Sequence, residues 1–213
     1  MPRDNRYGSL AVKTYRLIID PLIRPLRPKV VELCRDLDVE TILDIASGTG
    51  AQCRMLGEAG ISATGVDLSE DMVAHAQARG GRNVRYVQGS AYELPFDDAS
   101  FEACVLVLAL HEHTEEERTR MFAEALRVAS RYVVIADYER PQNSAFSPPW
   151  QLIRFIEHSA GAEHNAGFKH FVATGCLASL TERHGLIVDR EQTSHFGTMR
   201  IVAVRTSKLQ ILA

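Results

Sequence analysis

Thr41-Ile-Leu-Asp-Ile-Ala-Ser-Gly-Thr-Gly50 is the stretch that decides the fold, because it predicts a short buried strand, a glycine turn and the start of a helix. A second strand follows and ends in Thr64-Gly-Val-Asp-Leu-Ser69. Strand, turn, helix and a second strand with a terminal acid form a nucleotide-binding βαβ unit. Asp67 stands where a carboxylate can accept hydrogen bonds from both hydroxyls of a ribose. We therefore expect a ligand that carries a nucleoside.

Apolar runs of strand length alternate with helical patterns on both sides of this unit. A capping-box pair, Thr114 and Glu117, marks the start of one of these helices. The turn-prone segment 193–197 joins the last two strands without a helix, which indicates an antiparallel hairpin. The fold class expected is α/β: a Rossmann-like doubly wound seven-stranded sheet, mostly parallel, with an antiparallel terminal hairpin and helices on both faces. The predicted strands are 41–46, 62–67, 84–88, 102–108, 132–137, 186–193 and 199–205, and the predicted helices are 9–20, 28–37, 50–59, 69–79, 114–129 and 173–184.

The length of 213 residues fits one domain with a modest addition. Residues 138–172 break the alternation and are too long for an ordinary loop, so we expect a lid insertion, with a helix over 147–158 that covers the site. The division expected within 1–213 is an N-terminal helical segment at 1–38, a cofactor-binding core at 39–137, this lid, and a final helix and β-hairpin at 173–206.

Composition narrows the choice of partners. A net charge of −3 gives no electrostatic footprint for a nucleic acid, so none is expected. No apolar run reaches the ~20 residues of a membrane helix, so no integral membrane segment is expected. The N-terminus shows no apolar signal core, and the four cysteines lack CxxC spacing, which favours reduced thiols in the cytoplasm. The oligomeric state stays open.

Three motifs carry a resemblance to a known family. They are Leu43-Asp-Ile-Ala-Ser-Gly-Thr-Gly50, Gly65-Val-Asp-Leu-Ser69 and Gln88-Gly-Ser-Ala-Tyr-Glu-Leu-Pro-Phe-Asp-Asp-Ala-Ser-Phe-Glu102. Together they resemble the class I S-adenosylmethionine-dependent methyltransferases, in particular the ubiquinone/menaquinone-biosynthesis subgroup. The resemblance covers residues 40–137 well and 186–205 in outline. It implies S-adenosyl-L-methionine as cofactor, S-adenosyl-L-homocysteine as product, and a small-molecule methyl acceptor.

The resemblance also implies cofactor-binding roles for ten residues along the core. Asp44 would hold the turn or the methionyl amine, and Asp67 would hold the ribose; a loop-capping role is the alternative for Asp44. Leu68 and Met72 would pack on the adenine, although plain core packing is as good an interpretation of their spacing. Ser90 replaces the family's usual adenine-contacting aspartate, so this contact could pass to Ala91. The other four residues are Ala46, Gly48 and Gly50 beside the methionine moiety and Leu108 near the sulfonium.

A sulfonium methyl group is already activated, so the main catalytic device expected is alignment of donor and acceptor at ~3–3.5 Å. His111 is the candidate catalytic residue, either as a base or by positioning the acceptor. His111-Glu112-His113 is expected to end the fourth strand, and strand alternation would then put both imidazoles on one side and Glu112 on the other. A metal held by the two histidines and a lid residue is an alternative, but the spacing specifies no third ligand, and no metal is expected.

Four further residues are candidates for the substrate pocket: His113, Tyr138, His164 and His170. Tyr138 follows Asp137 at the end of the fifth predicted parallel strand, and two of the histidines lie in the insertion. Ionisable side chains in a lid favour an acceptor with polar or charged groups. A solvated loop is the alternative interpretation.

Two other functions compete with methyl transfer. An NAD(P)-dependent oxidoreductase is disfavoured because Cys53 stands where the dinucleotide fingerprint requires a third glycine or alanine. A non-catalytic S-adenosylmethionine-binding protein has only Ser90 in its favour. Methyl transfer to a small molecule in a lidded cleft is therefore the leading hypothesis.

Overall fold

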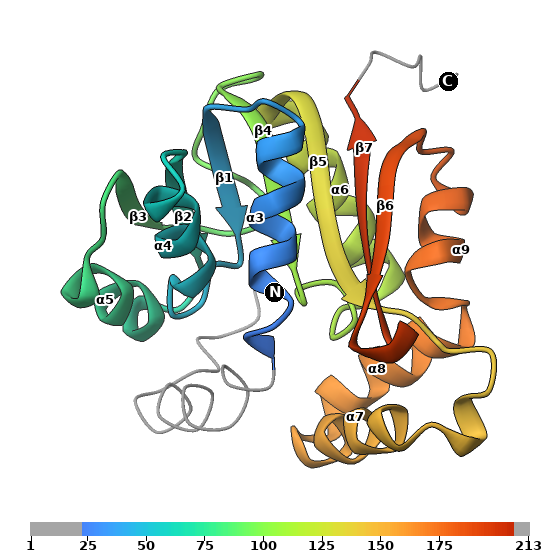
Figure 1. Cartoon of the computed structure of the whole chain (residues 1–213). Helices are drawn as coiled ribbons and strands as arrows, with labels where there is room; N and C mark the ends of the chain where they lie inside the picture. The colour runs from blue at the N-terminus through green and yellow to red at the C-terminus, as the bar shows by residue number, and fades with distance from the viewer. Residues whose placement is uncertain (1–22, 207–213) are drawn as a thin grey trace.

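Seven strands form one sheet in the order β3-β2-β1-β4-β5-β7-β6. The computed structural model describes residues 23–206 (Figure 1). The first five strands pair in parallel, whereas β7 is antiparallel to both β5 and β6. The predicted fold class, including the terminal hairpin, is confirmed. The strand bounds are β1 Thr41–Ile45, β2 Ser62–Asp67, β3 Val84–Gln88, β4 Phe101–Val107, β5 Ala129–Tyr138, β6 Val188–Ser194 and β7 Met199–Arg205.

The parallel strands are nearly continuous apolar runs because helices cover both faces of the sheet. In β1, Ile42, Leu43 and Ile45 are fully buried. Its neighbours β2 and β4 bring Gly65 and Val105 into register with Asp44. The strands β1, β2, β4 and β5 all run in one direction, so their carboxyl ends meet at one edge of the sheet, which is where ligands bind in open α/β sheets.

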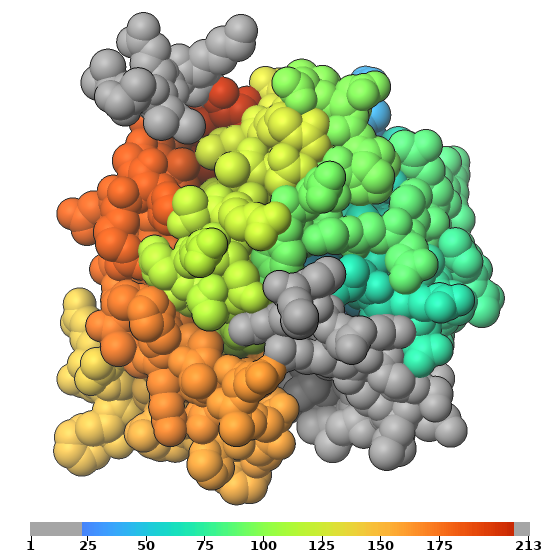
Figure 2. All heavy atoms as spheres, turned by 180° about the vertical axis from the view of Figure 1, so that it is seen from behind, coloured from blue at the N-terminus to red at the C-terminus, as the bar shows by residue number. Residues whose placement is uncertain are grey.

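The helices that flank the sheet begin and end close to the predicted positions. Right-handed crossovers place α4 and α5 on one face, where α4 packs beside α3, while α6 and α9 pack on β5 from the other face (Figures 1 and 2). The capping box predicted at the start of α6 is present, with reciprocal hydrogen bonds between Thr114 and Glu117. The bounds are α3 Arg27–Asp36, α4 Ala51–Glu58, α5 Glu70–Arg79, α6 Glu115–Val128 and α9 Cys176–Arg183; the helix predicted at 9–20 lies outside the described residues.

The insertion after β5 folds into a short 3-10 helix, η2 Ser144–Phe146, and two α-helices, α7 Pro148–Ser159 and α8 Ala162–Ala173. The helix predicted at 147–158 is confirmed as α7, and Ser147 caps it by accepting a hydrogen bond from the backbone N–H of Trp150. No helix was predicted at α8. Its buried stripe contains Gly167 beside Phe168 and Phe171, so glycine interrupts the apolar periodicity that would have indicated a helix.

Both insertion helices lie beneath the carboxyl edge of the sheet in Figure 1, below the point of the β5 arrow. Trp150 of α7 packs against Phe168 of α8, with ring centroids 6.0 Å apart, and Phe168 contacts Tyr138 of β5 at 5.6 Å. These three buried rings attach the helix pair to the sheet. None of the helices within residues 23–206 combines the length and the apolar character needed to cross a membrane.

Candidate active site

The turn between β1 and α4 has three residues in the left-handed region: Ala46 at φ 58°, Gly48 at φ 51° and Gly50 at φ 69°. Glycine is required at position 50 for a second reason, since a Cβ there would lie 2.6 Å from the Tyr86 ring. The Tyr86 hydroxyl donates a hydrogen bond to the Gly50 carbonyl at 3.1 Å. By contrast, a Cβ at Gly48 would meet no atom of residues 23–206 within 4 Å, so this side of the turn is open as far as the described part of the chain is concerned.

Asp67, the acid at the end of β2, is joined to the same turn. Its Oδ2 accepts a hydrogen bond from the Gly48 N–H at 2.7 Å, and its Oδ1 accepts one from the Ser69 N–H at 2.9 Å. Burial raises the pKa of Asp67, although these two hydrogen bonds act in the opposite direction. Each carboxylate oxygen can accept more than one hydrogen bond, so Asp67 retains acceptor capacity for ribose hydroxyls.

Asp44 is nearly inaccessible, with 2% of its surface exposed. The thiol of Cys53 in α4 donates a hydrogen bond to its Oδ2 at 3.3 Å. Burial raises the pKa of Asp44 to about 7, and the nearby Arg27 opposes the rise. A buried carboxyl group of this kind can gain free energy by pairing with a cationic ligand.

The remaining predicted cofactor residues surround the same edge. Leu68 is 40% exposed, which is unusual for a leucine directly after a buried strand, whereas Met72 is buried in the core. Ser90 and Ala91 are half-buried after β3, and Ser90 Oγ accepts a hydrogen bond from the Tyr92 N–H. The open side of Gly48, the acceptor oxygens of Asp67 and the exposed face of Leu68 are compatible with the ribose and adenine of the implied cofactor.

A second cluster of polar side chains lies beside the end of β4. His111 is 4% exposed, and its Nδ1 lies 2.9 Å from Asp137 Oδ1 at the end of β5. Asp137 Oδ2 also accepts the backbone N–H groups of Leu110 and His111. The opposite nitrogen of the ring, Nε2, lies 3.6 Å from Glu157 Oε2 of α7. Helix α7 and the core of the domain therefore meet at His111.

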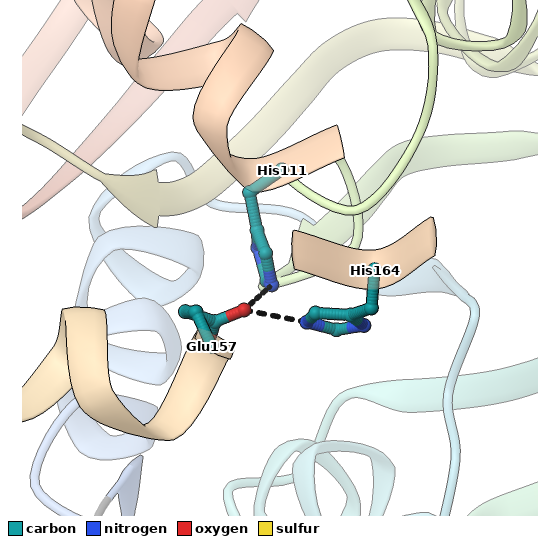
Figure 3. A group of neighbouring side chains, drawn as sticks. All are labelled: His111, Glu157 and His164. Carbon is teal, nitrogen blue, oxygen red and sulfur yellow. Dashed lines mark hydrogen bonds and ion pairs between the residues drawn. The ribbon is translucent and has the colours of Figure 1, made fainter. Parts of the chain in front are cut away.

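His164 of α8 reaches the same carboxylate from the other side. Figure 3 shows Glu157 between the two imidazoles, with one carboxylate oxygen, Oε2, directed at both rings. His164 Nε2 is hydrogen-bonded to Glu157 Oε2, and its Nδ1 lies 2.8 Å from Glu112 Oε2. The hydroxyl of Tyr138 donates a hydrogen bond to Glu157 Oε1 at 2.8 Å. The loop after β4, strand β5 and both insertion helices thus contribute to one network.

The network brings three carboxylates around two imidazoles in a region of low exposure. The neighbouring carboxylates Glu112 and Glu157 raise the pKa of His164 to about 10 despite its burial. The pKa of His111 is raised by Asp137 and Glu157 in the same way, again against burial. The pKa of Glu112 is lowered to about 2, because His164 hydrogen-bonds to it and offsets its burial. The cluster therefore favours the protonated, positively charged form of both imidazoles.

The expectation that His111 and His113 share one side of a strand is wrong. β4 ends at Val107, and Leu108 turns the chain away in a left-handed conformation at φ 54°, so strand alternation does not apply. Glu112 instead joins the network around His111, whereas His113 Nδ1 lies 2.9 Å from the Tyr92 hydroxyl.

Of the predicted pocket residues, Tyr138 and His164 contact Glu157 in this network. His170 does not, because its Nδ1 is bonded to the guanidinium of Arg118, a buried residue of α6. Glu157 is the central residue that sequence reasoning missed. The sequence signal that could have identified it is a glutamate at helical spacing from apolar residues, four positions after Ile153. A glutamate on an apolar helix face is buried with them and needs polar partners.

Comparison with known proteins finds relatives in sequence and in fold. Residues 42–131 match the model of a methyltransferase domain. The demethylmenaquinone methyltransferase of Thermotoga maritima is 32% identical over 125 residues, which cover 57% of this chain and 53% of the relative. An uncharacterized methyltransferase of Synechocystis is 26% identical over 171 residues, which cover 79% and 77%. The chain spans about half the length of the demethylmenaquinone methyltransferases that it matches.

A solved structure extends the likeness to the whole fold. The crystal structure of magnesium protoporphyrin IX methyltransferase from Synechocystis, with bound S-adenosylhomocysteine, has a TM-score of 0.68 over 93% of this chain and 95% of that one. The sequence identity is 16%, so this match concerns the fold alone. The motifs, the sheet order and these matches agree: residues 42–131 match a methyltransferase domain, the relatives named above are methyltransferases, and the whole chain shares the fold of a methyltransferase solved with bound S-adenosylhomocysteine.

Proposed function

We propose that this chain transfers the methyl group of S-adenosylmethionine to a polar small molecule that binds between the carboxyl edge of the sheet and helices α7 and α8. The observation that carries the proposal is the adjacency of two differently built regions at one edge. The Gly48–Asp67 turn presents open space and hydrogen-bond acceptors, and the network around Glu157 presents charged groups from the lid.

In this proposal the cofactor supplies an activated methyl group, and the protein aligns it with the acceptor. Asp67 holds the ribose, Leu68 covers the adenine, and Asp44 attracts the methionyl amine. His111 positions the acceptor, because Asp137 fixes its ring from behind and its other edge is turned toward the lid. The lid helices exclude water from the site.

The test is turnover. The purified chain is incubated with S-adenosylmethionine and a panel of quinols, phenols, amines and thiols, and release of S-adenosylhomocysteine is measured. Transfer to one acceptor class supports the proposal. Binding of both sulfur nucleosides without turnover on any class would favour a non-catalytic binding protein, and micromolar binding of NAD instead of them would favour the oxidoreductase.

A pH dependence of cofactor affinity is expected from Asp44. Its pKa of about 7 means that acidification below neutrality protonates the carboxyl group and removes its attraction for the methionyl ammonium. Affinity for S-adenosylhomocysteine should rise about tenfold between pH 6 and pH 8, as the ionised fraction increases. Calorimetric titration across this range measures it. The groups that act on Asp44 are Cys53, Arg27 and Asp67.

The matched control is Asp44→Asn, which preserves shape but cannot ionise. Its affinity should be lower and nearly constant over the same pH range. A wild-type affinity that does not change with pH would place the methionyl amine away from Asp44.

We also propose a cytoplasmic location. All four cysteines are free and buried, which is typical of proteins that function in reducing surroundings.

A further inference from the structure

We propose that His111 Nε2, Glu157 Oε2 and His164 Nε2 form a binding site for a divalent transition-metal cation, with Zn²⁺ as the simplest occupant. These three donor atoms lie within 4.8 Å of one another, in a part of the molecule where His111 and Glu157 are buried. The metal site considered from the sequence used His111 with His113 and an unspecified lid residue, whereas the cluster in the structure combines His111 with Glu157 and His164. The tertiary structure supplies Glu157 from α7.

The spacing of the donor atoms is close to what such a cation needs. Ligand atoms about 2.0–2.2 Å from a tetrahedral zinc ion lie roughly 3.4 Å from each other. His111 Nε2 and Glu157 Oε2 are 3.6 Å apart. His164 Nε2 and Glu157 Oε2 are closer, at hydrogen-bond distance, so cation entry requires this pair to separate by roughly 1 Å. His164 belongs to a helix of the lid and is half-buried, which leaves room for that movement.

Each of the three ligands is oriented by a partner behind it. Asp137 Oδ1 bonds the Nδ1 of His111 at 2.9 Å, and Glu112 Oε2 bonds the Nδ1 of His164 at 2.8 Å. The Tyr138 hydroxyl occupies Oε1 of Glu157 and leaves Oε2 for the site. Carboxylates that bond the distal nitrogen of metal-binding histidines fix the ring and raise its basicity, and they are a regular feature of such sites.

Charge and donor type select the class of cation. Ligation requires both imidazoles to be neutral, so the cation takes the place of the protons that the neighbouring carboxylates favour on these rings. The three carboxylates then carry three negative charges, and a divalent cation compensates two of them. Two imidazole nitrogens with one carboxylate oxygen suit zinc, iron, cobalt or nickel, whereas Mg²⁺ and Ca²⁺ prefer oxygen ligands. Three protein ligands also leave at least one position open, as in catalytic rather than structural sites.

The open position is where the methyl acceptor would bind. This part of the inference rests on the proposed function: an acceptor that offers an oxygen or nitrogen atom could ligate the cation and there release its proton to solvent more readily. The structure therefore assigns the acceptor to molecules with a metal-binding hydroxyl, carbonyl or amine group. Binding of the cation itself does not depend on this assignment.

The experiment is a calorimetric titration of the chelator-dialysed full chain with Zn²⁺. We expect one site with a micromolar or lower dissociation constant. Glu157→Gln and His164→Asn should each weaken it at least about 100-fold, and Glu112→Gln about 10- to 100-fold. His158→Asn is the matched control, since His158 lies on α7 next to Glu157 but is exposed and bonded to Asn165. This control should bind as the wild type does.

A second measurement distinguishes a variant that has lost the metal site from one that has failed to fold. Each protein is also titrated with S-adenosylhomocysteine, and the wild type is loaded with Co²⁺, whose visible spectrum should show a site of low symmetry without thiolate bands. Absence of Zn²⁺ binding by a wild-type chain that binds S-adenosylhomocysteine overturns the metal site and leaves the proposed function standing. Equal Zn²⁺ binding by the wild type and the Glu157 and His164 variants also overturns it. A chain that binds Zn²⁺ but neither sulfur nucleoside overturns the proposed function alone.

Discussion

Replacing Asp67 by alanine should weaken binding of S-adenosylhomocysteine by about 100-fold or more. The carboxylate is placed to accept the ribose hydroxyls, and each hydrogen bond to a charged group contributes ~1.5–3 kcal/mol. Asp67 also holds the glycine turn through the N–H groups of Gly48 and Ser69, so the variant loses both the acceptor and its support. Isothermal titration of the folded variant measures the effect.

Two further variants test whether the loss of affinity is specific to the carboxylate of Asp67. Asp71→Ala removes an exposed carboxylate from the first turn of α5 and should leave the affinity unchanged. Asp67→Asn retains one acceptor oxygen and should fall between the wild type and the alanine variant. If Asp67→Ala bound within threefold of the wild type, the ribose would have to lie elsewhere.

Gly167→Ala should destabilise the domain by ~2–3 kcal/mol, the usual cost of overpacking a close contact. A Cβ at this position would lie 2.3 Å from the carbonyl oxygen of Glu112, so α8 must move away from the loop that carries His111. The same movement should separate His164 from Glu112 and Glu157. Thermal unfolding is expected to show a melting temperature lower by roughly 5–10 °C.

The control for this variant is Ala166→Gly, one residue earlier on the exposed side of α8. It should lower the free energy of unfolding by only ~1 kcal/mol, because glycine is less favourable than alanine by about that amount inside a helix. An alanine at position 167 that left the melting temperature unchanged, or raised it, would show that α8 does not press on the Glu112 backbone.

Local patterns sufficed to predict most of the fold. The strand that ends at Ile45, the acid at the end of β2 and the capping box of α6 depend on neighbours within a few residues of one another. The terminal hairpin was predictable because residues 193–197 are too few and too turn-prone to hold a helix. The core then follows, because strands with these apolar runs need helices on both faces.

The second insertion helix could not be predicted in the same way. Gly167 lies where an apolar side chain would have completed the helical stripe, and it is there because the backbone of Glu112 passes against it. That contact joins residues 55 positions apart in the chain. A local pattern cannot show a requirement imposed by so distant a segment.

In the candidate site, too, the residue types could be predicted from the sequence, whereas the long-range contacts could not. His111, Tyr138 and His164 could be named from the sequence because their residue types suit acceptor binding, but their mutual arrangement could not. The left-handed turn at Leu108 ends the strand early and directs His111 and Glu112 into one network with Glu157. His170, of the same residue type and on the same helix as His164, is bonded to Arg118 instead.

The sequence by itself determined the cofactor class, since a glycine turn and an acid at a strand end bind a nucleoside through groups that lie close together in the chain. Only the tertiary structure decided what faces the acceptor. Glu157 receives His111 from one side and His164 from the other, although 46 residues separate it from His111. The physical reason is that a cluster of ligating side chains is defined by distances through space, and those distances exist only after α7 and α8 have packed against the carboxyl edge of the sheet.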